Sequence, residues 1–386
     1  MQIAQRIDRL GTETSFVVLA RARELEAQGK DIVHLEIGEP DFDTAPNIIE
    51  AAKNALDAGY THYGPAAGLP QFRKTIAEVE GARRGLEFKP DMVVVTPGAK
   101  PIMYYAIMAI VNPGDEVIYP NPGFPIYESA IELAGGTAVP LPLLESKGFS
   151  FNIDDLKSLI TPKTRMIVIN SPQNPTGGIL SQEDLREIAE LAVKHDLWVL
   201  TDEIYGRVTY DGFKNYTIAS YPGMMERTII LDGFSKTYAM TGWRLGYGIM
   251  PKHLAEVVAK LQTNVASCTA SFIQVAGIEA LTGPQDWVDN VVEEFRRRRD
   301  LIVDGMNSLP GFKCHKPLGA FYVFPNTTGT GMDSRTLANK ILNEGGVACL
   351  SGSTFGKYGE GYVRFSYANS MENIEKGIDR IRKLLS

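Results

Sequence analysis

A lysine in the segment GFSKT (233–237) is the first candidate for chemistry in this chain. Lys236 follows an apolar run, TIILD (228–232), which is typical of a strand buried on both faces. An amine at that depth has a lowered pKa and can form a Schiff base with a carbonyl compound. Most lysines are solvated surface residues, and this alternative stays open for Lys236 taken alone. The segment also approaches the GxSxG pattern of serine hydrolases, but Thr237 replaces its second glycine.

Three polar residues follow two other apolar runs. Asp202 ends LWVLTD (197–202), where a carboxylate needs a cation or several hydrogen-bond donors. A protonated pyridine nitrogen would suit it, and capping of a following helix is the alternative. Tyr205 would face the same side, or simply pack. Asn174 stands between two prolines in a rigid turn, where it would present its amide to a ligand or form a structural Asx turn.

A phosphate site is indicated by the segment GAKP (98–101), which follows a predicted strand and begins a predicted helix. Free N–H groups at such a helix start bind phosphate. Ser235 can add a hydroxyl and Arg244 a bidentate guanidinium, although a surface salt bridge is the alternative for Arg244. Arg364 lies among apolar residues in GYVRFSY, where a buried arginine must have a partner, and a structural ion pair is one alternative.

A mostly parallel sheet would position these residues. Apolar, β-branched runs alternate with amphipathic segments such as 181–195, in which Ser181 can cap a helix whose core stripe includes Leu185 and Ile188. This pattern predicts an α/β fold with helices on both faces of the sheet. Ligands in such folds bind at the carboxyl ends of the strands, so four polar loops should meet in one pocket. The predicted strands are 92–96, 116–120, 165–170, 197–202, 228–232 and 245–250.

The pattern changes after about residue 280, where a charged helix (288–309) precedes short strands (320–325 and 362–367) and a closing helix (371–385). We expect a smaller α+β domain there. The predicted division is an N-terminal segment joining the small domain (1–45), a large domain (46–280) and a small C-terminal domain (281–386).

Composition excludes several classes of protein. The chain has 386 residues with 39 basic and 46 acidic side chains, a net charge of −7, and no long basic run, so nucleic acid is not an expected partner. Three cysteines without CxxC spacing argue against disulfides and thiolate metal sites. The five histidines lack metal-ligand spacing, and no metal is expected. Without an apolar leader or membrane-spanning run, a cytoplasmic location is expected and no membrane partner.

A phosphate cradle, a Schiff-base lysine, an aspartate for a ring nitrogen and two arginines together describe a site for pyridoxal 5′-phosphate. Here the sequence resembles the fold-type I, class I/II aminotransferases, especially the branch of prokaryotic aspartate aminotransferases. The resemblance covers nearly the whole chain. It is carried by GEPDFDT (38–44), THYGPAAGLP (61–70), NPGDEV (112–117), NPTG (174–177), DEIY (202–205), SKTYAMTGWRLG (235–246) and RFSYA (364–368).

The resemblance implies a role for each site residue and a large domain that binds the cofactor. Lys236 would hold the cofactor as a Schiff base, Asp202 would pair with its ring nitrogen, and Tyr205 and Asn174 with its ring hydroxyl. The phosphate would be held by Ala99, Lys100, Ser235 and Arg244, with Tyr63 from the neighbouring subunit of a homodimer. The substrate α-carboxylate would be bound by Arg364, Asn174 and Gly38. Phe124 stands where aspartate-specific members often have a tryptophan, which puts strict aspartate specificity in question.

The expected activity is transamination from an L-amino acid to a 2-oxo acid by a ping-pong mechanism. Backbone N–H groups suffice for phosphate, so the Lys100 side chain is available for a second substrate carboxylate, which favours aspartate or another dicarboxylic donor. Alternatively, Lys100 adds charge to the phosphate site. A C–S lyase and an aromatic, alanine or prephenate-type aminotransferase of the same fold are alternative activities. A non-enzymatic sensor that binds the cofactor is a further alternative, but the chain shows no room for a DNA-binding domain before residue 38.

Overall fold

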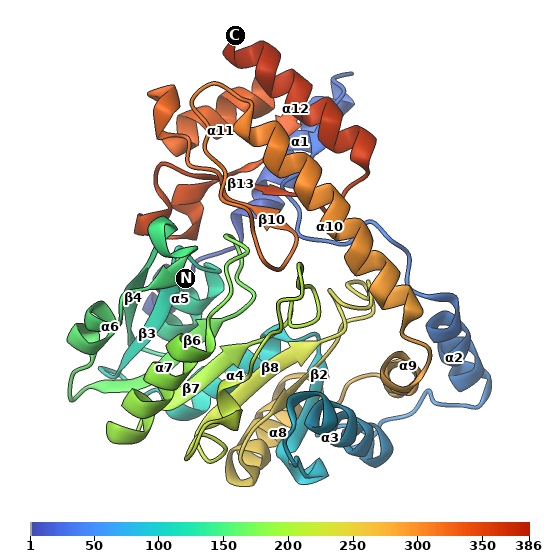
Figure 1. Cartoon of the computed structure of the whole chain (residues 1–386). Helices are drawn as coiled ribbons and strands as arrows, with labels where there is room; N and C mark the ends of the chain where they lie inside the picture. The colour runs from blue at the N-terminus through green and yellow to red at the C-terminus, as the bar shows by residue number, and fades with distance from the viewer. Residues whose placement is uncertain (1) are drawn as a thin grey trace.

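A computed structural model describes residues 2–386, in which the main element is an eight-stranded sheet (Figure 1). Its strand order is β2-β9-β8-β7-β6-β3-β4-β5. Only β9 and β5 run antiparallel to their neighbours, so the predicted α/β fold with a mostly parallel sheet is confirmed. The strands are β2 (Val93–Pro97), β3 (Glu116–Asn121), β4 (Thr137–Leu144), β5 (Ser150–Phe151), β6 (Thr164–Asn170), β7 (Trp198–Asp202), β8 (Thr228–Gly233) and β9 (Leu245–Ile249).

Helices cover both faces of this sheet. Successive residues of a strand point to opposite faces, so neighbouring residues pack against different helices. Leu200 packs in the same cluster as α4, α5 and α8, whereas Val199 packs with α6 and α7. The helices α2, α3 and α9 cover the β2–β9–β8 end. The bounds are α2 (Pro46–Asp57), α3 (Pro70–Arg84), α4 (Lys100–Ile110), α5 (Ile126–Leu133), α6 (Ile153–Leu159), α7 (Gln182–Lys194), α8 (Lys252–Ala266) and α9 (Ser271–Thr282).

Local sequence explains α7 well. The side chain of Ser181 accepts the N–H of Asp184, and the carboxylate of Asp184 accepts the N–H of Ser181 in return, which is a capping box. Leu185 and Ile188 of the predicted stripe are buried against the sheet. The capping residue and the apolar spacing therefore predict both the start and the buried face of this helix.

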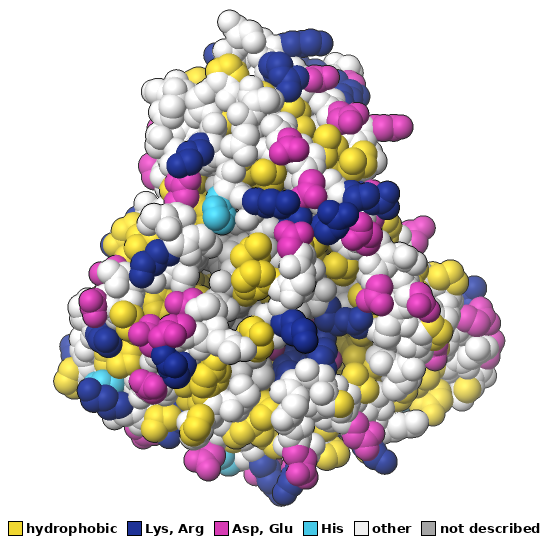
Figure 2. Space-filling model, viewed as in Figure 1, with side chains coloured by type: hydrophobic (Ala, Val, Ile, Leu, Met, Phe, Trp, Pro, Cys, Tyr) yellow, Lys and Arg dark blue, Asp and Glu magenta, His cyan; other side chains and the backbone are white. Residues whose placement is uncertain are grey.

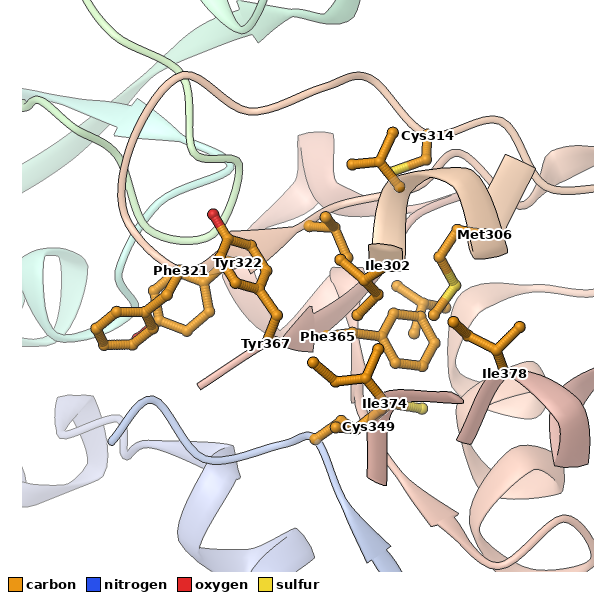
Figure 3. Close-up of a cluster of buried hydrophobic side chains, with 14 of the residues drawn as sticks. Ile302, Met306, Cys314, Phe321, Tyr322, Cys349, Phe365, Tyr367, Ile374 and Ile378 are labelled. Atoms are coloured by element: carbon orange, nitrogen blue, oxygen red, sulfur yellow. The ribbon is translucent and has the colours of Figure 1, made fainter. Parts of the chain in front are cut away.

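The C-terminal elements stand above the large sheet in Figure 1. Strands β10, β13 and β12 form an antiparallel sheet, and β1 pairs in parallel with β11. Figure 3 shows their core, in which Ile302 and Met306 of α10 lie near Phe365 of β13. The elements are α1 (Thr14–Ala27), β1 (Val33–His34), α10 (Asp286–Asn307), β10 (Tyr322–Val323), α11 (Ser334–Asn343), β11 (Val347–Ala348), β12 (Leu350–Ser351), β13 (Val363–Ser366) and α12 (Met371–Leu385).

The expected strand 320–325 is shorter than predicted, because only Tyr322 and Val323 pair with β13. Ala320 has a positive φ of 57°, and Pro325 has no N–H to donate, so the strand ends on both sides. Short 3-10 helices complete the described chain at Gln5–Arg9, Pro90–Met92, Glu145–Lys147, Ile218–Ser220, Thr328–Thr330, Gly352–Phe355 and Lys357–Gly359.

The surface in Figure 2 carries lysine and arginine side chains interspersed with acidic ones. Among residues 2–386, no helix combines the length and the hydropathy that a bilayer crossing requires.

Candidate active site

A cavity of about 540 Å³ lies at the carboxyl ends of the central strands, between the large sheet and the C-terminal elements. The loops after β2, β6, β7 and β8 all reach it, as expected for parallel strands. Of the site residues predicted from sequence, Tyr63 alone is outside the cavity, and its side chain is 90% exposed. The others line it: Gly38, Ala99, Lys100, Phe124, Asn174, Asp202, Tyr205, Ser235, Lys236, Arg244 and Arg364.

Lys236 enters the cavity from the turn that follows β8. Its Nζ donates a hydrogen bond of 2.6 Å to the carbonyl oxygen of Gly38, and Nζ lies 5.9 Å from the centre of the Phe321 ring. Burial lowers the pKa of this amine to about 8. A useful fraction of the amine is therefore unprotonated near neutral pH, which is what a Schiff base or a proton acceptor needs.

Asp202, the last residue of β7, is 8% exposed, and no ion pair to it is found among the described residues. Its Oδ2 accepts a hydrogen bond of 2.6 Å from the hydroxyl of Tyr127, and its Oδ1 accepts one of 3.2 Å from the N–H of Ile204. Burial raises the pKa of this carboxyl to about 6. A cationic N–H entering the cavity would stabilise the carboxylate, so the site fits a protonated ring nitrogen.

Two glycines let the Arg244 loop lie close to the start of α4, at one end of the cavity. Gly98, with a φ of +83°, faces Arg244, and a Cβ there would lie 2.2 Å from the Nη2 atom. A Cβ on Gly246 would lie 2.3 Å from the backbone nitrogen of Ala99. Because both positions are glycine, the Arg244 loop can approach the first turn of α4, whose N–H groups have no partner within the helix.

The donors at this end suit a phosphate dianion. Arg244 makes no ion pair within the described chain, and its Nη1 donates to the carbonyl of Thr241 at 2.8 Å. Ser235, Ala99 and Lys100 line the same cavity, and they can offer a hydroxyl and the N–H groups at the start of α4. A guanidinium, a hydroxyl and a helix N-terminus form a donor set for phosphate. The surface salt bridge considered for Arg244 is not observed.

Arg364 of β13 is 3% exposed but contacts no carboxylate within residues 2–386. Its Nη1 donates to Asn174 Oδ1 at 2.9 Å and its Nη2 to the backbone carbonyl of Glu36 at 2.5 Å, while Nε has no hydrogen-bond partner. The guanidinium also lies over the ring of Tyr322, 4.4 Å from its centre. The structural ion pair considered for Arg364 is therefore absent, and its buried charge is available to a ligand carboxylate.

Lys100 is 42% exposed at the wall of the cavity, where its Nζ pairs with the carboxylate of Glu13. The ammonium also lies 5.5 Å from the centre of the Phe124 ring. Glu13 belongs to a short stretch before and within the start of α1, residues 13–16, which lines this side of the cavity. The side chain of Lys100 thus points along the cavity wall and already has a carboxylate partner.

Sequence reasoning missed three residues of this site. Tyr127 donates to Asp202 across 75 positions of sequence, and Tyr322 shares a hydrogen bond of 2.8 Å with the hydroxyl of Tyr205. Glu13, which forms an ion pair with Lys100, is the third residue. Tyr127 falls in the same segment as Phe124, NPGFPIY, and that proximity is the only signal the sequence offered. Among the described residues, no group of three or more histidine, cysteine, aspartate or glutamate side chains can hold a metal ion.

Comparison with known proteins agrees with this geometry. The family model described as aminotransferase class I and II matches residues 30–381. An aspartate aminotransferase from Pyrococcus abyssi is 46% identical over 94% of both chains. An aromatic-amino-acid aminotransferase from Thermococcus litoralis is 43% identical over 93% of both. The structure of Thermus thermophilus aspartate aminotransferase with maleate superimposes with a TM-score of 0.95 at 37% identity, over 100% of both chains.

The predicted fold, cofactor and type of reaction are confirmed together by these matches, because the matched family consists of enzymes that use pyridoxal 5′-phosphate to transfer amino groups. The chain belongs to the class I and II aminotransferases.

Proposed function

We propose that this transaminase uses dicarboxylic amino acids, aspartate or glutamate, as amino donors and the matching 2-oxo acids as acceptors. One observation carries the proposal: besides Lys236 and Arg244, the cavity presents two cationic side chains, Arg364 from β13 and Lys100 from the start of α4. Arg364 would bind the α-carboxylate that every amino acid has. Lys100 would bind the second carboxylate that only a dicarboxylic substrate has.

The residues proposed to hold the cofactor follow from the chemistry of each part of the cavity. The phosphate would be bound by Ser235, Arg244 and the first turn of α4, and Asp202 would accept the ring N–H. Bound pyridoxal phosphate supplies an electron-withdrawing ring that stabilises negative charge on the substrate Cα. Remaining contacts would come from Phe124 against the ring face and from Asn174 and Tyr205 at the ring hydroxyl.

The proton steps are assigned to two groups of this chain. Asp202, as a carboxylate, would keep the ring nitrogen protonated, and the hydroxyl of Tyr127 would hold the carboxylate in place. Lys236, with an amine pKa lowered to about 8 by burial, would take the proton from the substrate Cα. The same amine would then move that proton to the C4′ position of the cofactor, and hydrolysis that releases the 2-oxo acid would complete the first half of the ping-pong cycle.

Substrate orientation is assigned to Arg364 and its neighbours. Nη1 of Arg364 donates to Asn174 and Nη2 donates to the carbonyl of Glu36. Hydrogen bonds, and not an ion pair, therefore fix the orientation of the guanidinium. Gly38 contributes space: a Cβ there would lie 1.9 Å from the Tyr322 hydroxyl. A planar α-carboxylate would therefore meet a guanidinium of fixed orientation.

A homodimer is part of the proposal. Tyr63 is 90% exposed and outside the cavity of its own chain, so its proposed contact with phosphate requires a second copy. We also propose a cytoplasmic location and a role in amino-acid biosynthesis; the first is supported by three cysteines, Cys268, Cys314 and Cys349, none of which forms a disulfide.

The test is the substitution Lys100→Ala. Loss of a charge-assisted hydrogen bond should lower kcat/KM for aspartate by roughly 1.5–3 kcal/mol, about 10- to 150-fold, while changing the value for alanine little. Lys157→Ala, an exposed lysine in α6, is the matched control. An equal fall for aspartate and alanine would place Lys100 at the phosphate and remove the support for a dicarboxylic donor.

Aromatic amino acids are a second candidate donor class, because Glu13 already neutralises Lys100 and the aromatic side chains of Phe16 and Phe355 border the same cavity. Turnover of phenylalanine with 2-oxoglutarate, compared with aspartate, measures this directly.

A further inference from the structure

We propose that Glu13 is a replaceable counter-ion for Lys100. Glu13 would neutralise the lysine when a ligand with an apolar side chain binds, and would leave it when a dicarboxylic ligand binds. This inference rests on the proposed function, because it takes Lys100 as the site of the second carboxylate.

The position of Glu13 in its helix is the first observation. Glu13 is the residue immediately before α1, where a negative charge interacts favourably with the helix dipole and the free N–H groups of the first turn are the nearest local donors. Its side chain makes no such hydrogen bond. Instead it turns to Lys100, 87 positions away in sequence, and is 18% exposed. The carboxylate therefore has its partner across the cavity and none in its own helix.

The second observation is that Glu13 stands within the field of the reacting groups. Burial lowers the pKa of Lys236, and the negative charges of Glu39 and Glu13 oppose that effect. Glu13 also opposes the lowering of the Arg364 pKa by burial. A second carboxylate entering between these cations would thus meet Glu13 as a like charge.

The third observation concerns freedom of movement. Residues 10–13 belong to no helix or strand. Gly11 is held to α5, since its N–H donates to Ser129 Oγ at 2.9 Å, and only Thr12 separates that anchor from Glu13. Rotation about the side-chain torsions of Glu13 is enough to turn its carboxylate away from Lys100, so Gly11 and α1 can stay in place.

These observations give opposite consequences for two kinds of ligand. An apolar side chain that covers the cavity wall would leave the Lys100 ammonium desolvated, and Glu13 removes most of that penalty by pairing with it. A dicarboxylic ligand brings its own carboxylate and must displace Glu13, so part of its binding free energy is lost in that exchange. One cavity can then accept both ligand classes.

Binding of two unreactive acids to the holoenzyme tests this inference. Succinate carries two carboxylates, whereas 3-phenylpropionate carries one and an apolar ring; both are titrated by the change in cofactor absorbance. Glu13→Gln removes the charge and keeps the shape. We expect the Kd of succinate to fall roughly three- to tenfold and the Kd of 3-phenylpropionate to rise by a similar factor. Glu24→Gln, an exposed position of α1, should change neither.

The outcomes separate this inference from the proposed function. If Lys100→Met leaves succinate binding unchanged, both fail. If Lys100→Met weakens succinate binding but Glu13→Gln leaves both Kd values unchanged, or moves them in the same direction, only the counter-ion inference is overturned. In the double variant Glu13→Gln/Lys100→Met no unpaired charge remains, so 3-phenylpropionate should bind at least as well as in the wild type; weaker binding there would also overturn the inference.

Discussion

Replacing Asp202 by asparagine removes the negative charge of the side chain and keeps its shape. The amide oxygen can still accept a hydrogen bond from Tyr127, which lies 2.6 Å from the carboxylate, or from the N–H of Ile204. The side chain volume is nearly unchanged, so the end of β7 should keep its position. What disappears is the negative charge that would hold a proton on the ring nitrogen.

The magnitude follows from the burial of this carboxyl. Its pKa is raised from 3.8 to about 6, which corresponds to about 3 kcal/mol of unfavourable burial of the charged form. A cationic N–H partner would offset a cost of this size, because its charge favours the carboxylate form of Asp202. Loss of the partnership should therefore raise the barrier to Cα proton removal by roughly 3–4 kcal/mol, which lowers kcat about 150- to 900-fold.

A single-turnover measurement with aspartate gives the cleanest reading, because the cofactor's absorbance reports the first half-reaction. Tyr127→Phe is the matched control: it keeps the charge of Asp202 and removes one donor, so a fall of about tenfold is expected. Retention of cofactor is checked in both variants by its absorbance. If Asp202→Asn holds the cofactor and keeps kcat within threefold of the wild type, Asp202 is a structural residue and the assignment is wrong.

Three further predictions concern other parts of the chain. Borohydride should fix the cofactor on Lys236, and Lys236→Ala should retain cofactor binding but lose most turnover; peptide mapping that finds another lysine modified would refute the first. His34, whose pKa is raised to about 9 mainly by its hydrogen bond to Glu36, contributes stability that is complete below pH 6.5 and lost as the pH rises through 9. With 30% of its side chain exposed, we expect roughly 1–2 kcal/mol, seen as a steeper loss of Tm between pH 6 and 10 than in His34→Gln. Gly38→Ala should displace Tyr322 and raise KM for every donor alike, in contrast to Lys100→Ala.

The parts of the fold that could be predicted depend on local pattern. Helix α7 was predictable because Ser181 and its apolar stripe mark its start and its buried face. The central strands were predictable because both of their faces are buried, but the same property hides their direction. Nothing in the run 245–250 showed that β9 lies antiparallel between β2 and β8. Direction depends on the connection to the preceding strand, and residue pattern alone does not report it.

The sequence also indicated some residues of the candidate site but not the contacts between them. Lys236, Asp202 and Asn174 were recognisable because each follows an apolar strand or a rigid turn at a place where polar residues are unusual. The hydrogen bond from Tyr127 to Asp202 and the ion pair between Glu13 and Lys100 were not predictable. Both join residues 75 or more positions apart, and such contacts depend on the tertiary arrangement of the helices and not on local sequence.

The catalytic residues and Glu13 line one cavity but belong to different parts of the chain. This separation has a consequence for how the enzyme can evolve. Asp202 ends β7 and Lys236 follows β8, in the middle of the large sheet, where most substitutions would disturb packing on both faces. Glu13 belongs to a stretch without regular hydrogen bonding, near the beginning of the chain. Substitutions in this stretch would change which substrate side chains the cavity accepts, and they would leave the free energy of folding nearly unchanged. A duplicated gene could therefore acquire a new substrate specificity in a few mutational steps while the catalytic residues stay the same.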